Sequence, residues 1–365
     1  MQWMLCCEFL WLAACLVLGC CAGLPDTPAT RLLEQRAVEF EGADIAASTR
    51  VEYQSHWKYW LRFCLVFGLS QYCFQPCERV VVWFAVWLSR SCNPRVVSTY
   101  LSGLRYHFQA AGLLTAAEWA GWLHLPRVLK GMKRVLGTPV SRKLAITPAM
   151  LAGMARVVPM TAEGMCLWCA MLLCFYAFLR KSHVCVQGST LLVPHLLLQR
   201  QHVVIDPAAY AIIVTVHFSK TAQYNSGAHT IVIKGVKGGV LDPVYWLSRY
   251  FAMVPAPAAG PCFVIPHKGS GGLRPLRYAH LVASLKQWLA AAGYDPAQYS
   301  GHSLRRGGAT AAFQAGADPL FIRLQGGWSS DAWLLYVGLS DVQRQRVSVL
   351  MQESFLRLPG LRRVR

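Results

Sequence analysis

Acidic side chains are scarce in this 365-residue chain, which has 17 Asp and Glu against 36 Lys and Arg and a formal net charge of +19. No acidic residue occurs between Trp119 and Ala162 or between Glu163 and Asp206. A two-metal catalytic site requires several converging carboxylates, so the composition disfavours one. A strongly basic chain instead favours a polyanionic partner, for which nucleic acid is the better candidate and an acidic membrane surface the alternative.

A compact cysteine framework is also missing. The 14 cysteines are spread along an apolar, tryptophan-rich chain without disulfide-scaffold spacing. Cys166 and Cys169 form a Cys-x-x-Cys, but they lie with Cys174 in an apolar run that has no other ligand pair at zinc spacing. We therefore expect reduced, mostly buried thiols and no metal site.

Polar residues are nearly absent from the first 24 residues, apart from Gln2 and Glu8. This composition resembles a signal peptide or a marginal membrane helix, although the basic start of a signal peptide is missing. The segment is either an organellar or membrane address or an incorrect start in the gene model, and the sequence does not separate these. A membrane-tethered protein therefore stays open as an alternative.

Turn-prone stretches divide the rest of the chain, which is long enough for two domains with a core each. We expect a linker at 25–43, a basic helical domain at 44–137, an interdomain linker at 138–146, a second domain at 147–356 and a basic tail at 357–365.

Helix signals are frequent in both domains. Aromatic and basic residues alternate at helical spacing over 48–63, and capping pairs predict helix starts at Asn93-Pro94 and Thr147-Pro148. The very apolar run over 161–179 predicts a buried central helix.

Strand signals are confined to the second domain. The β-rich runs at 201–205, 211–218 and 229–233 predict three short strands. The predicted fold class is therefore mainly α with a small antiparallel β-sheet.

Six residues of the second domain have an order and spacing that suit breaking and rejoining a DNA backbone: Arg180, Lys220, His302, Arg305, Trp328 and Tyr336. Phosphodiester transfer needs a nucleophile, stabilised charge on the phosphoryl oxygens and a proton for the leaving oxygen. In a domain poor in carboxylates, a cluster of cations is favoured over bound metal. His302 and Arg305 lie three apart, near the positive end of a helix expected from Ser303, and Arg180 supplies a second guanidinium for bidentate contacts.

These residues resemble the pattern of the tyrosine recombinases, also called phage-type integrases: Arg, a hairpin Lys, His-x-x-Arg, His or Trp, and then Tyr. The chain offers, in that order, Phe178-Leu-Arg180, Phe218-Ser-Lys220, His302-Ser-Leu-Arg305, Gly326-Gly-Trp328 and Leu335-Tyr336. The match spans residues 147–351. It implies a mixed α+β catalytic domain, preceded by a helical (SAM-like) core-binding domain, in a recombinase or integrase of mobile-element type.

By this resemblance Tyr336 attacks the scissile phosphate, which gives a 3′-phosphotyrosine and a free 5′-hydroxyl. Arg180 and Arg305 hold the phosphate oxygens, and Trp328 donates its indole N–H or packs against them. Because the phosphotyrosine bond conserves the energy of the broken one, the resemblance implies no ATP, metal or other cofactor.

Proton transfer falls to two further residues. The resemblance assigns protonation of the leaving 5′-oxygen to Lys220, and acceptance of the tyrosine proton or positioning of the phosphate to His302. One position departs from the family pattern. His183 stands where the family often has a carboxylate, and a neutral imidazole does not neutralise the arginine pair.

Further basic residues are candidates for contacts with flanking DNA phosphates, the alternative being a solvated basic face. They are Arg95, Arg105, Lys130, Lys133, Arg134, Lys181 and Arg306. Double-stranded DNA is the expected partner, and no small-molecule substrate or membrane is expected. A final helix expected at 341–356 has an apolar stripe without an evident partner; in the family such a tail packs on a neighbouring subunit, which implies a homo-tetramer on two DNA sites. Packing on its own core is the alternative.

Two other functions stay open. A type IB topoisomerase shares the chemistry but relaxes supercoils without joining different partners. A catalytically inactive remnant of a mobile element would still bind DNA without covalent capture. We expect the protein in the nucleus or another DNA-containing compartment.

Overall fold

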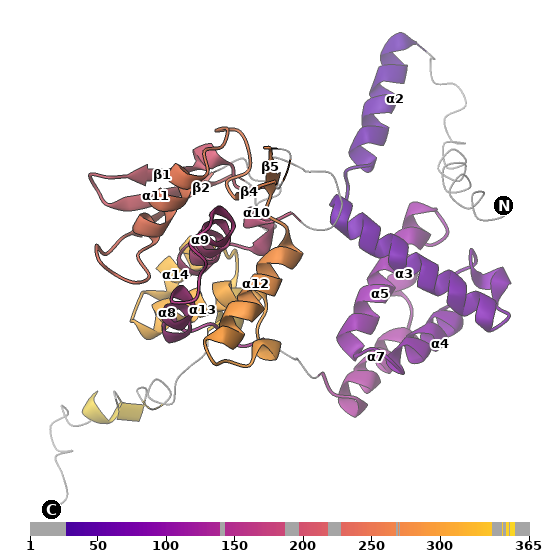
Figure 1. Ribbon diagram of the computed structural model, residues 1–365. Coiled ribbons are helices and arrows are strands. Elements are labelled where there is room, and N and C mark those ends of the chain that lie inside the picture. The colour runs from indigo at the N-terminus through magenta and orange to yellow at the C-terminus, as the bar shows by residue number, and fades with distance from the viewer. Residues whose placement is uncertain are drawn as a thin grey trace, which may run out of the picture. The chain divides into compact units, whose positions relative to one another are not determined.

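The computed structural model describes residues 27–138, 143–186, 197–217, 228–267, 269, 271–337, 345, 348–349 and 351–354. The apolar segment 1–24, Lys220 and most of the expected helix at 341–356 lie outside these residues. The chain divides between Ser141 and Arg142 into two compact units, which we call the N-terminal and the C-terminal unit (Figure 1).

Helices are the only regular secondary structure in the described residues of the N-terminal unit. Its helices are α2 (Pro28–Glu41), α3 (Ala47–Val66), α4 (Glu78–Ser89), α5 (Pro94–Ala110), α6 (Ala116–Ala120) and α7 (His124–Val135), with a short 3₁₀ turn η2 (Ser70–Tyr72). Asn93 caps α5 ahead of Pro94, as predicted, and Thr115 and Glu118 form the capping box of α6.

Aromatic rings fill the core of this unit, where α3 packs against α5 and α4 against α7. Trp60 is fully buried, and its ring meets Phe84 edge-on at 5.3 Å and Phe108 at 5.8 Å. Edge-to-face pairs of this kind stabilise a core beyond the area they bury. Trp57, Trp60 and Phe63 of the 48–63 pattern thus lie on the inner face of α3, whereas Tyr59 is exposed.

The expected linker at 25–43 contains a helix that was not predicted individually: Pro28–Glu41 forms α2. Thr27 caps it and Pro28 occupies its first turn, so the same residues that signal a turn also start a helix. None of its residues is buried, and Leu33 and Phe40 are among the exposed apolar side chains.

The C-terminal unit mixes helices with two small sheets. Its α-helices are α8 (Pro148–Ala155), α9 (Ala162–Tyr176), α10 (Lys181–Val184), α11 (Pro243–Met253), α12 (Tyr278–Ala291), α13 (Gly301–Gln314) and α14 (Pro319–Gln325). Its 3₁₀ turns are η4 (Arg200–His202), η5 (Pro296–Gln298) and η6 (Asp331–Leu335), and its strands are β1 (Val203–Asp206), β2 (Ala211–Val216), β3 (His229–Lys234), β4 (Val264–Pro266) and β5 (Leu273–Pro275).

Helix α9 lies at the centre of the C-terminal unit, as its composition predicts, with α11, α12 and α13 packed around it (Figure 1). Every residue from Gly164 to Phe175 is buried. Helix α13 approaches α9 closely because Gly308 has no side chain, and Gly307 allows a similar approach to the segment before α8. A Cβ at Gly308 would overlap the Phe175 carbonyl oxygen, and one at Gly307 would overlap the Ile146 carbonyl oxygen.

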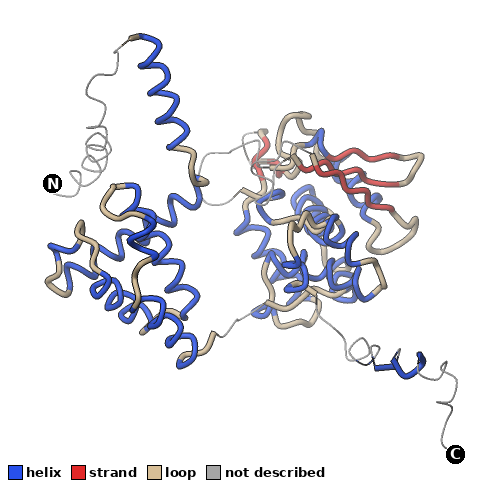
Figure 2. The backbone as a smooth tube through the Cα atoms, turned by 180° about the vertical axis from the view of Figure 1, so that it is seen from behind, coloured by secondary structure: helices blue, strands red, loops and turns tan. Residues whose placement is uncertain are grey.

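The strands of the described chain all lie in this unit (Figure 2). β1, β2 and β3 form an antiparallel sheet in that order, with the antiparallel pairing that was predicted, and Val216 pairs with His229 at the end of the hairpin next to the β2–β3 connection. The second sheet, β4 with β5, was not predicted, because its strands are only three residues long and flank a glycine-rich loop. The fold class is therefore mainly α with small antiparallel sheets.

Cysteines and helices bear on two further predictions. Every described cysteine is a free thiol, and Cys166, Cys169 and Cys174 are buried in the core, as expected. Burial raises the pKa of the Cys166 thiol to about 12. In the part of the chain that the structure describes, each helix is too short or too polar to traverse a bilayer.

Candidate active site

Arg305 is the most deeply buried charged group of the site, with 2% of its surface exposed. It lies in the first turns of α13, which Ser300 and Ser303 cap reciprocally. Its Nη1 donates to the Phe178 carbonyl and its Nη2 to the Gly326 carbonyl at 2.8 Å. Its buried Nε has no hydrogen-bond partner among the described residues, so one donor is unmatched.

Two neighbouring aromatic rings contact this guanidinium. The Arg305 Cζ lies 4.0 Å from the centre of the Trp328 ring and 5.7 Å from that of Tyr336. The two rings lie 5.4 Å apart, centre to centre. Cation–π attraction favours the charged guanidinium at this position, where burial opposes it. Burial, followed by the nearby charge of Arg180, lowers the pKa of Arg305.

Tyr336 follows directly on η6, and the side chain of Ser330 caps the start of η6. The Tyr336 carbonyl accepts from the Thr310 hydroxyl at 3.0 Å, which ties the expected nucleophile to α13. Trp328, Trp333, Phe178 and Ile322 form a small buried cluster beneath it, and the Tyr336 ring packs against that cluster. The tyrosine is therefore half-buried beside Arg305.

Arg180 is placed by an unusual stretch of backbone between α9 and α10. Phe178 has φ 48, in the left-handed region that side chains other than glycine rarely adopt. This turn presents the Phe178 carbonyl to Arg305 and sets Arg180 at the start of α10. Burial lowers the pKa of Arg180, and the nearness of Tyr336 raises it by a smaller amount.

His302 lies in the first turn of α13 and its side chain reaches the surface. Its pKa is lowered by partial desolvation and then by the positive charges of Lys181, Arg305 and Arg180. Lys181 itself lies over the ring of Tyr278, at 4.1 Å from the ring centre. Desolvation, and after it the surrounding cations, therefore favour the neutral imidazole.

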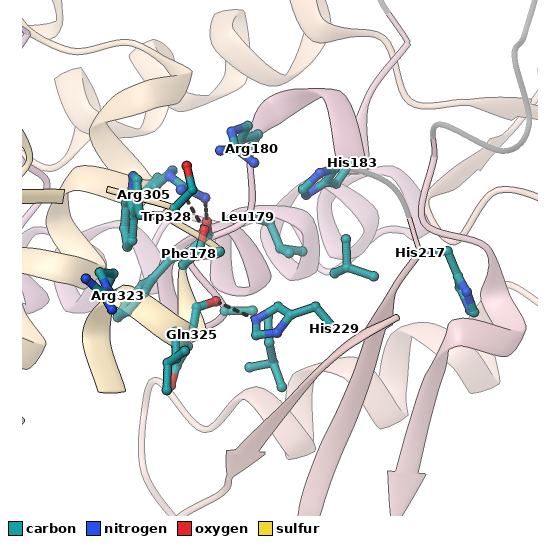
Figure 3. Close-up of a pocket in the computed structure, with 17 residues that line it drawn as sticks. Phe178, Leu179, Arg180, His183, His217, His229, Arg305, Arg323, Gln325 and Trp328 are labelled. Carbon is teal, nitrogen blue, oxygen red and sulfur yellow. Dashed lines mark hydrogen bonds between the residues drawn. The ribbon is translucent and has the colours of Figure 1, made fainter. Parts of the chain in front are cut away.

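A pocket of about 270 Å³ adjoins these groups (Figure 3). Arg180, Arg305 and Trp328 lie on one side of it, and His229 and Gln325 contact each other below them in that view. His183, which is 6% exposed, also lines the pocket. The walls therefore carry basic and imidazole groups, and no carboxylate is among the lining residues of the described chain.

The expected contacts with flanking phosphates have two different environments. In the N-terminal unit the side chains are exposed on α5 and α7: Arg95, Arg105, Lys130, Lys133 and Arg134. In the C-terminal unit, Arg306 is half-buried and its Nη1 donates to the Lys143 carbonyl at 2.9 Å.

Comparison with solved structures identifies the fold. The chain is similar to a Tn1549 transposon integrase in complex with transposon right-end DNA (TM-score 0.55, 12% identity, 87% of this chain and 98% of that one). It is also similar to the XerH site-specific recombinase bound to a palindromic difH substrate (0.53, 12%, 76% and 73%) and to a lambda integrase dimer bound to a COC′ core site (0.52, 14%, 90% and 85%). This chain has the tyrosine-recombinase fold. No protein-family model matches it, and no curated protein is significantly similar in sequence.

On this tyrosine-recombinase fold, the structure brings Arg180, Arg305, Trp328 and Tyr336 together and sets His302 beside them. Lys220 belongs to the β2–β3 connection and lies outside the described residues. One expectation needs revision. Both arginine forks were expected to be free for phosphate oxygens, but the two Nη atoms of Arg305 already bond backbone carbonyls. Each Nη carries two hydrogens, so donors are left over.

Sequence reasoning missed the groups that hold these side chains in place. They are the carbonyls of Phe178 and Gly326, which hold Arg305. His229, Gln325 and Arg323 of the pocket wall were missed as well. The pair Gly326-Gly327 before Trp328 is the one signal that could have pointed to them. A Cβ at Gly326 would overlap the Trp328 ring, and Gly327 has φ 60.

Proposed function

We propose that this chain cleaves and rejoins DNA strands through a covalent 3′-phosphotyrosine at Tyr336, as a site-specific recombinase or integrase. The observation that carries the proposal is the placement of the Arg305 guanidinium next to both Trp328 and the half-buried Tyr336, with Arg180 beside it. A nucleophile next to two desolvated cations suits attack on a phosphodiester. DNA bound in the structures of similar fold supports the same partner here.

The phosphate would bind between Arg180 and Arg305. The unmatched Nε and remaining Nη hydrogens of Arg305 are donors for non-bridging oxygens, as are those of Arg180. Both guanidinium pKa values are lowered by burial, and a bound phosphate would compensate the charge that burial disfavours. Because the protein already holds Arg305, it need not reorganise when charge builds up on phosphorus.

In the cleavage step the Tyr336 oxygen forms a bond to phosphorus while the bond to the 5′-oxygen breaks. The tyrosine proton passes to His302, whose neutral form is favoured by desolvation and by its cationic neighbours, and Lys220 supplies a proton to the leaving oxygen. Rejoining is the reverse reaction with a 5′-hydroxyl of another strand. Each transfer exchanges one phosphodiester bond for another, so the proposal includes no ATP and no metal.

The test is a suicide substrate, a nicked DNA duplex that loses its 5′-hydroxyl fragment after cleavage and so traps the covalent complex. Wild-type protein should give a protein–DNA band on a denaturing gel when the substrate is DNA from the ends of its own mobile element. Tyr336→Phe should give no such band. Tyr294→Phe is the matched control, since Tyr294 is half-buried elsewhere in the C-terminal unit and should retain the band.

His183 favours a second candidate function, an inactive DNA-binding remnant, because a buried imidazole stands where a carboxylate is expected. Sequence-selective binding without any Tyr336-dependent band would support this candidate. Relaxation of supercoiled DNA without exchange between duplexes would instead support a type IB topoisomerase. Light scattering with and without paired DNA sites tests the proposed tetramer.

A further inference from the structure

The loop that carries Trp328, here called the Trp328 loop (residues 325–328), is fixed by contacts from three different elements. Gln325 Nε2 donates to the Tyr176 carbonyl, at the end of α9, at 2.6 Å. The Gly326 carbonyl accepts from Arg305 of α13. The Gln325 carbonyl lies 3.2 Å from Nε2 of His229, the first residue of β3. Adjacent carbonyls therefore receive donors from an arginine on one element and a histidine on another.

We propose that His229 is a positioning residue for strand cleavage, which acts by fixing the Trp328 loop against Arg305. A carbonyl only accepts, so the imidazole must carry its hydrogen on Nε2 at this contact. His229 also lines the pocket next to the arginines, and Figure 3 shows it reaching from the strand to Gln325. It does not take part in the bonding changes; its effect passes through the loop.

The proposal follows from how the loop supports the site. Trp328 lies over the Arg305 guanidinium at 4.0 Å, and the Gly326 carbonyl fixes Arg305 Nη2. Two glycines allow the loop to turn, but they also leave it many alternative conformations. Each external hydrogen bond removes part of that freedom. Without the His229 hydrogen bond, the Gly326 carbonyl and the Trp328 ring could shift, and the guanidinium they hold would shift with them.

This inference rests on the proposed function, and its experiment separates the two. Two variants change the histidine: His229→Ala removes the donor, and His229→Gln places an amide N–H at a similar reach. Val232→Ala is the matched control, because Val232 lies on the same strand with an exposed side chain. Equilibrium DNA binding and the single-turnover rate of covalent complex formation are measured for each. Melting curves establish that each variant is folded.

We expect His229→Ala to slow covalent complex formation by about tenfold, the scale of removing one hydrogen bond from an otherwise intact site. DNA affinity should stay within about twofold, since the flanking phosphate contacts are unchanged. His229→Gln should recover most of the rate, and Val232→Ala should match the wild type. Equal rates for His229→Ala and wild type would overturn the inference, as would a failure of His229→Gln to improve on alanine.

A substrate with sulfur in place of the scissile 5′-oxygen tests whether His229 affects the protonation of the leaving group or the positioning of the phosphate. A thiolate leaves without a proton, so this substrate relieves defects on the leaving-group side alone. His229→Ala should remain slow with the sulfur substrate, because the variant disturbs Arg305, which holds the phosphate. Recovery on sulfur would overturn the proposal and assign His229 to the leaving-group side.

Gln325→Ala offers a route that leaves His229 intact. It removes the hydrogen bond to Tyr176 and should slow cleavage in the same way, and the double variant with His229→Ala should be less impaired than the product of the two single effects. Independent, multiplicative effects would contradict a shared action through the loop. A complete absence of the Tyr336-dependent band in wild-type protein would instead overturn the proposed function, and with it the role of His229.

Discussion

The cations expected to contact DNA have different environments in the two units. On α5 and α7 of the N-terminal unit the expected DNA contacts are exposed, and the core beneath is aromatic. In the C-terminal unit Arg305 is almost completely buried, bonded to two backbone carbonyls and covered by Trp328. An exposed cation is hydrated and adaptable, whereas a buried one is fixed and costly to charge.

We therefore expect the exposed cations to contribute to DNA affinity and the buried guanidinium to contribute to the rate of strand cleavage. Exposed lysines and arginines attract a phosphate backbone through a long-range, salt-dependent field. A desolvated, preoriented guanidinium acts over a few ångströms, and its value lies in stabilising charge as it develops. We therefore expect substitutions in the two units to have different signatures.

The largest effect is expected at the buried cation. Arg305→Ala should reduce the rate of covalent complex formation by about 10²- to 10³-fold, the usual consequence of removing one donor to a developing charge. Arg305→Lys should restore little, because an ammonium cannot reach both carbonyls and a phosphate. Single-turnover cleavage at saturating DNA measures this. If Arg305→Lys were as fast as the wild type, the several donors of the guanidinium would not be required.

Glycine substitutions contrast the packing of the two units. Gly308→Ala should destabilise the protein by about 1–3 kcal/mol or more, because the added methyl overlaps the Phe175 backbone. Gly131→Ala, on α7, meets nothing within 4 Å and should stabilise by about 0.5–1 kcal/mol. Denaturant unfolding compares the two. Equal effects would mean that α13 can move away from α9 at little cost.

Removal of exposed cations should change binding without changing chemistry. In Lys130→Ala/Lys133→Ala/Arg134→Ala, the slope of log affinity against log salt should become shallower by roughly 0.9 for each phosphate that the protein no longer neutralises. The cleavage rate of this triple variant at saturating DNA should equal that of the wild type. Arg79→Ala, which removes an exposed cation outside the expected DNA-binding set, is the control. An unchanged slope in the triple variant would remove α7 from the DNA interface.

The smallest effect concerns pH. The second-order cleavage rate reports groups of the free enzyme. A neutral His302 accepts the proton, so activity should rise with pH through its pKa, which lies below the ordinary 6.5. Lys181→Ala removes one cause of the lowering and should move this acidic limb upward, by less than about one pH unit. A downward shift would contradict the assignment of the limb to His302.

Sequence patterns predicted the helices and the three-stranded sheet because their signals are local. Capping pairs such as Asn93-Pro94 and the apolar run of α9 specify their elements without knowledge of the rest of the chain. The order of Arg180, Arg305 and Tyr336 along the chain likewise indicated the candidate site without knowledge of the fold.

The supports of the site could not be predicted, because they are backbone atoms brought together by tertiary packing. The Phe178 and Gly326 carbonyls belong to positions 127 and 21 residues away from Arg305, and no side-chain pattern marks a carbonyl. The contact of His229 with Gln325 spans 96 residues in the same manner. The helix α2 was missed for a different reason, since proline and threonine signal both a turn and a helix start.

The left-handed backbone of Phe178 has a consequence for which sequences can carry this site. Glycine would relieve the torsional cost of φ 48 but would leave a hole against Trp328, whose ring lies 6.1 Å from that of Phe178. Valine or isoleucine would fill the hole but tolerate the torsion worst of all. Position 178 should therefore accept only large side chains that are unbranched at Cβ, two residues before an arginine. That restriction is a filter for finding distant chains in which the arginine site is intact.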